Sequence, residues 1–311
     1  MRLIKQSFEI WNQPDGLEGV YKQIEKAGRV CYKSEDKITE DSAKPFVDRM
    51  VKSDHGAMLE HGTVYLEFHV KDPSEVGEEK YHSQQNELNK LINKYANNKY
   101  SIIKVNHYYD TVFITTNYRV LIENNWLKDL KYICEPTVFH ERRVAVHFVC
   151  DRGILAEFTR HRVFSFSAES TRYCNYSKDK FGNELTFIIP CWMDIPEGSI
   201  NLGNYDKTSA RYEDGNVHII DTKPPYVGVD FIRSLCEAEA NYLSIVRNGW
   251  TPQQAREVLP LAVKSELISC GFEDAWKNFF YRRCAKDAHP MAQEIAKPMH
   301  KEFIERGFID K

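Results

Sequence analysis

The chain has 311 residues and a formal net charge of −3, with the apolar and charged fractions of a folded globular protein. This acidic balance argues against a surface built to attract nucleic acid or an acidic membrane, so any anion site must be local. No apolar run approaches the roughly 20 residues that cross a bilayer, and residues 1–13 lack the apolar core of a secretory signal. We therefore expect a cytoplasmic protein without a membrane segment or a nucleic-acid partner.

The first predicted elements follow hydrophobic periodicity. Residues 16–32 and 41–53 carry apolar side chains at helical spacing, and Asp41 or Ser42 is suited to cap the second helix. Residues 61–70 are rich in β-forming side chains and predict a strand. These elements belong to the expected core.

Residues 71–143 differ from the segments around them in being polar and rich in Asn and Lys. A helix is expected in the middle, and residues 110–124 suit either two short strands or a strand followed by a helix start. Because the segment has its own aromatic side chains, we interpret it as an insertion between core elements.

The second half predicts, in order, a strand at 144–151, a helix at 154–162, a strand at 185–190, a loop-rich insertion at 194–226 and a long helix at 227–247. Thr251, Pro252 and Gln254 then have the pattern of a capped helix start. Pro260 is expected to kink or end that helix, which would resume over 261–289. Helices and strands mix without a βαβ rhythm. This favours one α+β domain over 1–311, with a mixed or antiparallel sheet flanked by long helices.

The eight cysteines are scattered singly, without a Cys-x-x-Cys pair or a His/Cys zinc spacing. This pattern is typical of cytosolic proteins, in which thiols stay reduced. It predicts free thiols and no metal site.

Cations and hydroxyls cluster in the stretch RHRVFSFSAESTRY. If Arg160, His161 and Arg162 continued a helix, they would point in three directions, because neighbours on a helix do not share a face. One guanidinium would then serve a nucleotide phosphate and the next a second ligand, since the planar fork suits phosphate. The hydroxyls of Ser165 and Ser170 can also bond to phosphate oxygens. An isolated Arg-His-Arg, however, is more often a solvated basic turn.

The full pattern resembles the signature of the flavin-dependent thymidylate synthases. It matches at Arg160, His161, Arg162, Ser165, Ser170, Arg172 and Tyr173. A second similarity comprises Ala255-Arg256 before Leu259-Pro260, then Asn278, Phe279, Phe280 and Arg283. A weaker one comprises Glu60-His61 before a strand, Thr63, and Cys31 where the family usually has serine.

The resemblance implies a homotetramer with active sites between subunits, where FAD, dUMP and methylenetetrahydrofolate meet and NADPH supplies reducing equivalents. The expected reaction is methylation of dUMP to dTMP. FAD contacts are implied for Arg160, His161, Arg162, His61, Thr63 and Asn278. Contacts with dUMP are implied for Glu157, Arg160, Glu169, Ser170, Arg172, Arg283 and, from a neighbouring subunit, Arg256.

The chemistry of this reaction explains the predicted catalytic residue. Uracil must become nucleophilic at C5, and a fixed cation near N3 and O4 stabilises the developing anion. We assign that role to Arg283. Reduced flavin would deliver the hydride, so no cysteine nucleophile is needed. Cys174 and His289 are then predicted to be packing or capping residues, and the likeness of Cys191 in IPCW to a nucleophile segment to be coincidental.

Six positions depart from the family pattern. Ser167-Ala168 replaces a common Asn-Glu, Glu169 lies one position after the usual glutamate, and Glu157 stands where Gln is frequent. Phe272 and Asp274 replace a common Asn and Arg. Because an aspartate facing FAD phosphates is unfavourable, part of the adenine-side contacts must differ in this chain.

Two alternatives stay open at this stage. The small Ser167-Ala168 pair keeps open a related flavin- and folate-dependent modification of a pyrimidine nucleotide, such as hydroxymethylation of dUMP, because water could reach the reaction centre there. The other alternative is a non-catalytic RNA or nucleotide binder that uses the basic signature. Such a binder would show steep salt dependence without flavin.

Overall fold

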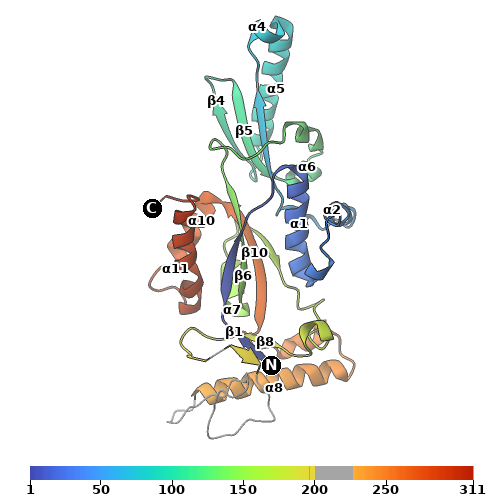
Figure 1. Cartoon of the computed structure of the whole chain (residues 1–311), viewed down its shortest axis with the longest axis vertical. Helices are drawn as coiled ribbons and strands as arrows, with labels where there is room; N and C mark the ends of the chain where they lie inside the picture. Colours follow the sequence, from blue (N-terminus) through green and yellow to red (C-terminus); the bar gives the residue numbers. More distant parts are fainter. Residues whose placement is uncertain (196, 200–226, 311) are drawn as a thin grey trace.

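The computed structural model describes residues 1–195, 197–199 and 227–310. These residues form three tiers along the long axis of the molecule (Figure 1), each built on one small sheet. Most strand pairs are antiparallel, and helices cover the sheets. The predicted α+β class with an antiparallel sheet and flanking helices is therefore confirmed.

The strands of the three sheets come from distant parts of the chain. They are β1 (Arg2–Ile4), β2 (Ser7–Trp11), β3 (Thr63–His69), β4 (Ile102–Asn106), β5 (Thr111–Asn117), β6 (Arg143–Asp151), β7 (Ser165–Ala168), β8 (Thr186–Ile188), β9 (Gly198–Ser199) and β10 (Lys264–Phe272). The central sheet has the order β2-β6-β10-β7, the second β3-β5-β4 and the third β8-β1-β9.

The helices vary from single turns to long amphipathic segments. They are α1 (Gly16–Tyr32), α2 (Ala43–Lys52), α3 (Gly56–Leu59), α4 (Pro73–Val76), α5 (Glu78–Ala96), α6 (Tyr118–Glu123), α7 (Arg152–Phe158), α8 (Val227–Arg247), α9 (Pro252–Ala255), α10 (Glu273–Arg283) and α11 (Pro290–Glu305). Short 3-10 turns lie at Glu35–Lys37, Leu127–Tyr132, Asp179–Phe181 and Arg256–Val258. The predicted helices at 16–32, 41–53 and 227–247 and the predicted strands at 61–70, 144–151 and 185–190 are confirmed.

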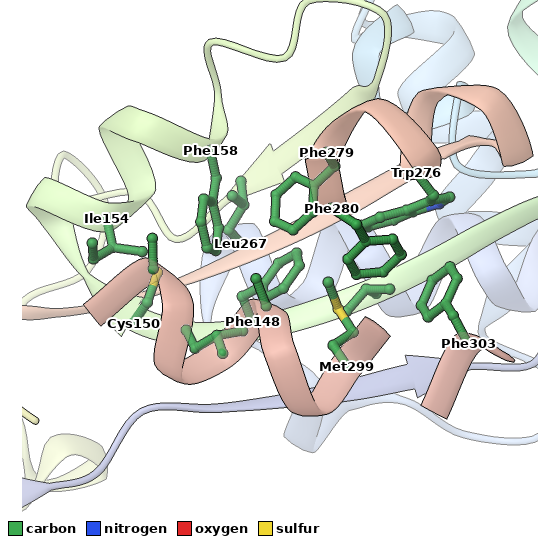
Figure 2. Packing of buried hydrophobic residues seen from close by; sticks show 14 of the residues in the cluster. Phe148, Cys150, Ile154, Phe158, Leu267, Trp276, Phe279, Phe280, Met299 and Phe303 are labelled. Atoms are coloured by element: carbon green, nitrogen blue, oxygen red, sulfur yellow. The ribbon is translucent and has the colours of Figure 1, made fainter. Parts of the chain in front are cut away.

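The central sheet separates two layers of helices. Alternate side chains of β6, including Val146 and Phe148, pack against α7, α10 and α11 in a core dominated by aromatic rings such as Trp276 and Phe279 (Figure 2). The opposite face packs on α1, where Ile268 of β10 joins a smaller apolar group. This two-sided burial follows from the period-2 alternation of a strand.

The β3-β5-β4 sheet forms the tier that carries α4 and α5 in Figure 1. Helix α5 lies in the middle of 71–143, as predicted, and residues 110–124 form strand β5 followed by helix α6. Strand β5 pairs along its length with β3, so residues 71–143 complete a sheet with a strand that precedes them. That the segment is an insertion stays a prediction, as does the single-domain assignment.

The third tier packs β1 and β8 against α8, with Leu3 and Phe187 fully buried. Most of the predicted loop-rich insertion 194–226 lies outside the described residues. The capping pattern at the start of α9 is present, because Gln254 Oε1 accepts hydrogen bonds from the Thr251 backbone N–H at 2.9 Å and its hydroxyl at 3.0 Å.

The prediction that a helix resumes directly after Pro260 is wrong, because residues 264–272 form strand β10. This strand is paired on both sides, with β6 and with β7, and it lies at the centre of the sheet. Its Ser, Ile, Cys and Gly residues are weak helix formers. Gly271 is needed there, because an added Cβ would lie 2.6 Å from the ring of Phe164. The helix begins only at Glu273.

Candidate active site

Arg283 ends helix α10, and residues at the end of α7 hold its guanidinium in place. Its Nη1 donates to Glu157 Oε2 at 2.5 Å, its Nη2 to the Glu157 carbonyl oxygen at 2.5 Å, and its Nε to His161 Nε2 at 3.0 Å. A guanidinium has five N–H donors. Three are used here, so two remain for a ligand.

This group lines an open cleft of about 750 Å³. Six sequence-predicted residues meet here: Glu157, Arg160, His161, Arg162, Asn278 and Arg283. Arg282 and His289 also line the cleft. Within the described part of the chain, no carboxylate forms an ion pair with Arg160, Arg162 or Arg282, and the only ion pair of Arg283 is with Glu157. Four arginines and two carboxylates, Glu157 and Asp287, line the cleft. It therefore carries excess positive charge, as an anionic ligand requires.

His161 is held neutral in this cleft. Burial and the positive charges of Arg283 and Arg282 lower its pKa to about 4. Because Nε2 accepts from Arg283, the ring proton must be on Nδ1. The neutral imidazole therefore orients Arg283 without adding charge.

Arg160 and Arg162 do not continue a helix, so that part of the α7 prediction is wrong. Helix α7 ends at Phe158, and the chain then turns through hydrogen bonds from the His161 N–H to the Phe158 carbonyl and from the Phe164 N–H to the His161 carbonyl. Phe164 is buried against the Trp276 ring, with a centroid distance of 4.5 Å. Burial of this ring stops the helix and returns the chain into β7.

A second predicted group follows the other end of β7. The backbone N–H of Ser170 donates to the Cys31 carbonyl at the end of α1, which fixes the start of this loop. Arg172 Nε donates to Gln253 at 3.0 Å, and Arg256 Nη1 lies 3.5 Å from the Thr171 hydroxyl. Arg256 of the same chain thus lies beside this loop, although the resemblance assigns that contact to a neighbouring subunit.

Glu169 is buried, and its carboxylate already has hydrogen-bond partners. Its carboxylate accepts from Lys264 Nζ at 2.8 Å and from the Tyr176 hydroxyl at 2.9 Å. Lys264 also binds Glu266, which accepts in turn from Lys33 and His147. In this chain Glu169 therefore belongs to an ion-pair network on the α1 side of the sheet, and its contact with dUMP stays a prediction.

His61 and Thr63 lie apart from the Arg283 cleft, at the start of β3. His61 is fully buried, neither ring nitrogen has a hydrogen-bond partner among the described residues, and the Phe166 backbone is near but outside bonding geometry. Burial and the charge of Arg143 lower the pKa of His61 to about 3. Thr63 accepts from Arg143 Nη1 at 3.3 Å.

The sequence analysis missed Arg143 and the Lys264–Glu266 pair. Arg143 opens strand β6, where it lies opposite Phe272 of β10. The departure at Phe272 was visible in the sequence, but only the strand register places an arginine beside it. Lys264 and Glu266 were not recognised as an ion pair, because a helix was predicted where they lie in strand β10.

The thiols and His289 agree with packing or capping roles. Burial and Glu169 raise the pKa of Cys174 to about 12, and burial and Glu294 raise the pKa of the exposed Cys191. Neither cysteine is activated as a thiolate. His289 caps α11, because its Nδ1 accepts from the Met291 backbone N–H at 3.3 Å.

The described residues contain no membrane-spanning helix and no cluster of metal ligands. Neither a long apolar helix able to span a membrane nor a group of three or more His, Cys, Asp or Glu side chains arranged for a metal ion is found among them.

Comparisons with known proteins point to one family. The profile of the family described as "Thymidylate synthase complementing protein" matches residues 78–306. A "Flavin-dependent thymidylate synthase" of Corynebacterium aurimucosum is 26% identical over 145 residues, which are 47% of this chain and 51% of the relative. The chain thus spans about half the length of the curated relative that it matches.

Among solved structures, matches include a UMP/dUMP methylase from Streptomyces cacaoi bound with 5-Br dUMP. It has 15% sequence identity and a TM-score of 0.41, covering 98% of this chain and 93% of the other. The same methylase bound with 5-Br UMP has 13% identity and a TM-score of 0.42, covering 98% and 92%.

Proposed function

The chain belongs to the family of thymidylate synthase complementing proteins, and we propose that it methylates dUMP to dTMP. Methylenetetrahydrofolate would donate the carbon, reduced FAD the hydride, and NADPH the reducing equivalents. The observation that carries the proposal is the Arg283 group, a half-buried guanidinium with two free donors in a cationic cleft. The flavin-dependent relative supports the choice of cofactor.

The residues of the cleft suit a dinucleotide such as FAD. Arg160 and Arg162 are exposed and have no carboxylate partner among the described residues, so the donors of both are available to a ligand. Asn278 adds an amide that can donate and accept. When bound here in reduced form, the flavin would supply the hydride.

Arg283 would stabilise the anion that develops on the uracil ring. Its two free N–H groups can donate to O4 and, once the N3 proton has passed to solvent, to N3 of a ring placed in the cleft. Glu157 and His161 hold the fork in one orientation. The charge is arranged before the reaction, so no reorganisation is required as C5 becomes nucleophilic. Arg283 thereby lowers the cost of forming the anion without accepting a proton.

Ser170, Arg172 and Arg256 would bind the phosphate of dUMP. This loop joins the end of α1, whereas Arg283 lies on the α10 side of the central sheet. We therefore propose that one nucleotide contacts the phosphate loop of one subunit and Arg283 of another. This arrangement agrees with the homotetramer implied by the family, and we propose a cytoplasmic enzyme of that form.

The structure does not favour the hydroxymethyl alternative. Ser167 is 2% exposed, and its hydroxyl donates to the Ala27 carbonyl at 3.0 Å. Its side chain therefore faces α1, which supports the methyl product. The methyl product stays the proposal.

The test supplies dUMP, methylenetetrahydrofolate and flavin reduced chemically in deuterium oxide, and examines the nucleotide product by mass spectrometry. Deuterium in a new 5-methyl group is the expected result. A product heavier by one oxygen, without deuterium at that carbon, would move the assignment to hydroxymethylation. Absence of any nucleotide product, together with no quenching of FAD fluorescence at micromolar protein, would overturn the proposed function.

A further inference from the structure

Two adjacent arginines lie at the edge of a second cavity, which shares no lining residue with the Arg283 cleft. The cavity is about 210 Å³ in volume, between the start of β6 and the N-terminal end of α1. Arg142, Arg143, Thr63 and Gln13 line it. This volume would hold several water molecules at about 30 Å³ each, or a small anion.

Arg143 is partly buried and bonds only to neutral oxygens. Its Nη1 donates to the Glu60 carbonyl at 3.0 Å and to the Thr63 hydroxyl at 3.3 Å, and its Nη2 donates to the Ser165 hydroxyl at 3.1 Å. Across the described residues, no carboxylate forms an ion pair with Arg142 or Arg143. Partly buried charges are normally paired, since desolvation of an unpaired ion is costly.

Gln13, the first turn of α1 and Asp15 also line the cavity. The side-chain amide of Gln13 makes two hydrogen bonds with the Thr63 backbone: it donates to the carbonyl oxygen and accepts from the N–H, both at 2.8 Å. The first turn of the 17-residue helix α1 faces the same space, and its N–H groups favour an anion. Asp15, the acidic lining residue, is exposed and makes no capping hydrogen bond, so its charge opposes an anion.

Arg143 lies beside a position at which this chain departs from the pattern that the family resemblance implies. The arginine common at position 274 is an aspartate here, and its side chain is 93% exposed beside Lys277. Arg143 lies opposite Phe272 in the strand pair, with its guanidinium 5.5 Å from the centre of that ring. Arg143 therefore places a cation beside Phe272, the residue directly before α10.

We propose that Arg142 and Arg143 form a diphosphate-binding site in this cavity, which takes the diphosphate of FAD. The inference rests on the proposed function for the identity of the dinucleotide. It rests on the contacts of the two arginines for the anion itself. FAD bound here would contact Thr63 of one subunit and the Arg160–Arg162 turn of another.

The experiment measures dissociation constants for inorganic pyrophosphate and for FAD by titration calorimetry. The proteins are the full chain, Arg143→Gln, Arg142→Gln, Asp15→Asn and the control Arg233→Gln, which removes a surface cation on α8. We expect each of the first two variants to weaken both ligands about tenfold or more, since each removes a charge-assisted bond. Asp15→Asn should tighten both, and Arg233→Gln should change neither.

Arg142→Gln guards against a folding artefact, because the exposed Arg142 has no hydrogen bond or ion pair within the described residues. Pyrophosphate that fails to bind, or that binds Arg142→Gln and Arg143→Gln as it binds the unchanged chain, would overturn the anion site. Weakened pyrophosphate with unchanged FAD would overturn FAD as its ligand. If the unchanged chain binds no FAD, the proposed function fails, and the pyrophosphate titration alone decides the anion site.

Discussion

The two faces of the central sheet use charge in opposite ways. On the α10 side, aromatic side chains fill the core, and Arg283 lies at its edge with two donors free. On the α1 side, Lys264, Glu266 and His147 bind one another. These contacts satisfy Glu266 and hold the pKa of its carboxyl well below the usual range.

We propose that this difference separates a cation available to a ligand, Arg283, from charges that stabilise the fold. We expect loss of Arg283 to reduce turnover with little effect on stability. Loss of Glu266 should do the reverse.

Arg283→Ala is expected to reduce dTMP formation by on the order of 1,000-fold, because it removes preorganised charge at the uracil ring. Reduction of flavin by NADPH should survive at least in part, and urea unfolding should shift by only about 1 kcal/mol. Arg283→Lys should also be poor, since a point charge lacks the planar fork. Lys277→Ala on the same helix is the control, and near-normal dTMP formation by Arg283→Ala would contradict the assignment.

Glu266→Gln should lower the free energy of unfolding by about 3 kcal/mol at pH 7, because Lys33 and Lys264 lose a buried counter-charge. The depressed pKa of Glu266 stabilises the fold above the carboxyl's unfolded pKa, and this stabilisation is lost as pH falls towards the folded value. The difference from the unchanged chain should therefore shrink in acid. Urea titrations at several pH values measure it, with the exposed Glu305→Gln as control; equal stability at pH 7 would refute the prediction.

His61 should make the protein sensitive to mild acid. Its folded pKa of about 3 lies below the unfolded value near 6.5, so between these values only the unfolded chain binds the proton. Stability should fall by about 1.4 kcal/mol per pH unit below 6.5, or about 2 kcal/mol at pH 5. His61→Phe should flatten the unfolding free energy measured between pH 7 and 5 relative to the exposed control His82→Gln. An unchanged slope would exclude His61 as its source.

Glu157→Gln tests whether position or charge matters beside Arg283. The amide can keep the hydrogen bond to Nη1, so dTMP formation should stay within about threefold of normal. Glu157→Ala should lose about tenfold or more, because Arg283 is no longer oriented. Steady-state rates with saturating dUMP distinguish the two, and equal losses would show that the negative charge itself is required.

Cys191→Ser should have the smallest effect. No thiolate is needed in the proposed reaction, and the pKa of Cys191 is raised. Cys174→Ser should likewise keep most activity. Thermal unfolding confirms that each variant is folded; loss of dTMP formation by folded Cys191→Ser would favour a cysteine nucleophile instead.

Local patterns predicted much of the fold. Helices α1, α2 and α8 and strands β3, β6 and β8 follow from hydrophobic spacing and turn residues, which act within a few positions of the chain. Strand β10 was taken for a helix because its pairing with β6 and β7 depends on residues more than 90 positions away. The signature and Arg283 were also named from the sequence, and the structure brings Glu157, Arg160, His161, Arg162 and Asn278 together with it.

Motif spacing identifies the family and the cationic residue types of the cleft, since both depend only on residue type and order along the chain. The neighbours of each charged side chain depend on how the chain folds in three dimensions. In the folded chain, Glu169 pairs with Lys264, and two N–H donors of Arg283 have no partner within the described residues. Arg143 lies beside Phe272, and no carboxylate of the described residues forms an ion pair with it. Strand register and helix packing join residues more than 90 positions apart, and the partners they supply determine whether a charge is neutralised within the fold or available to a ligand.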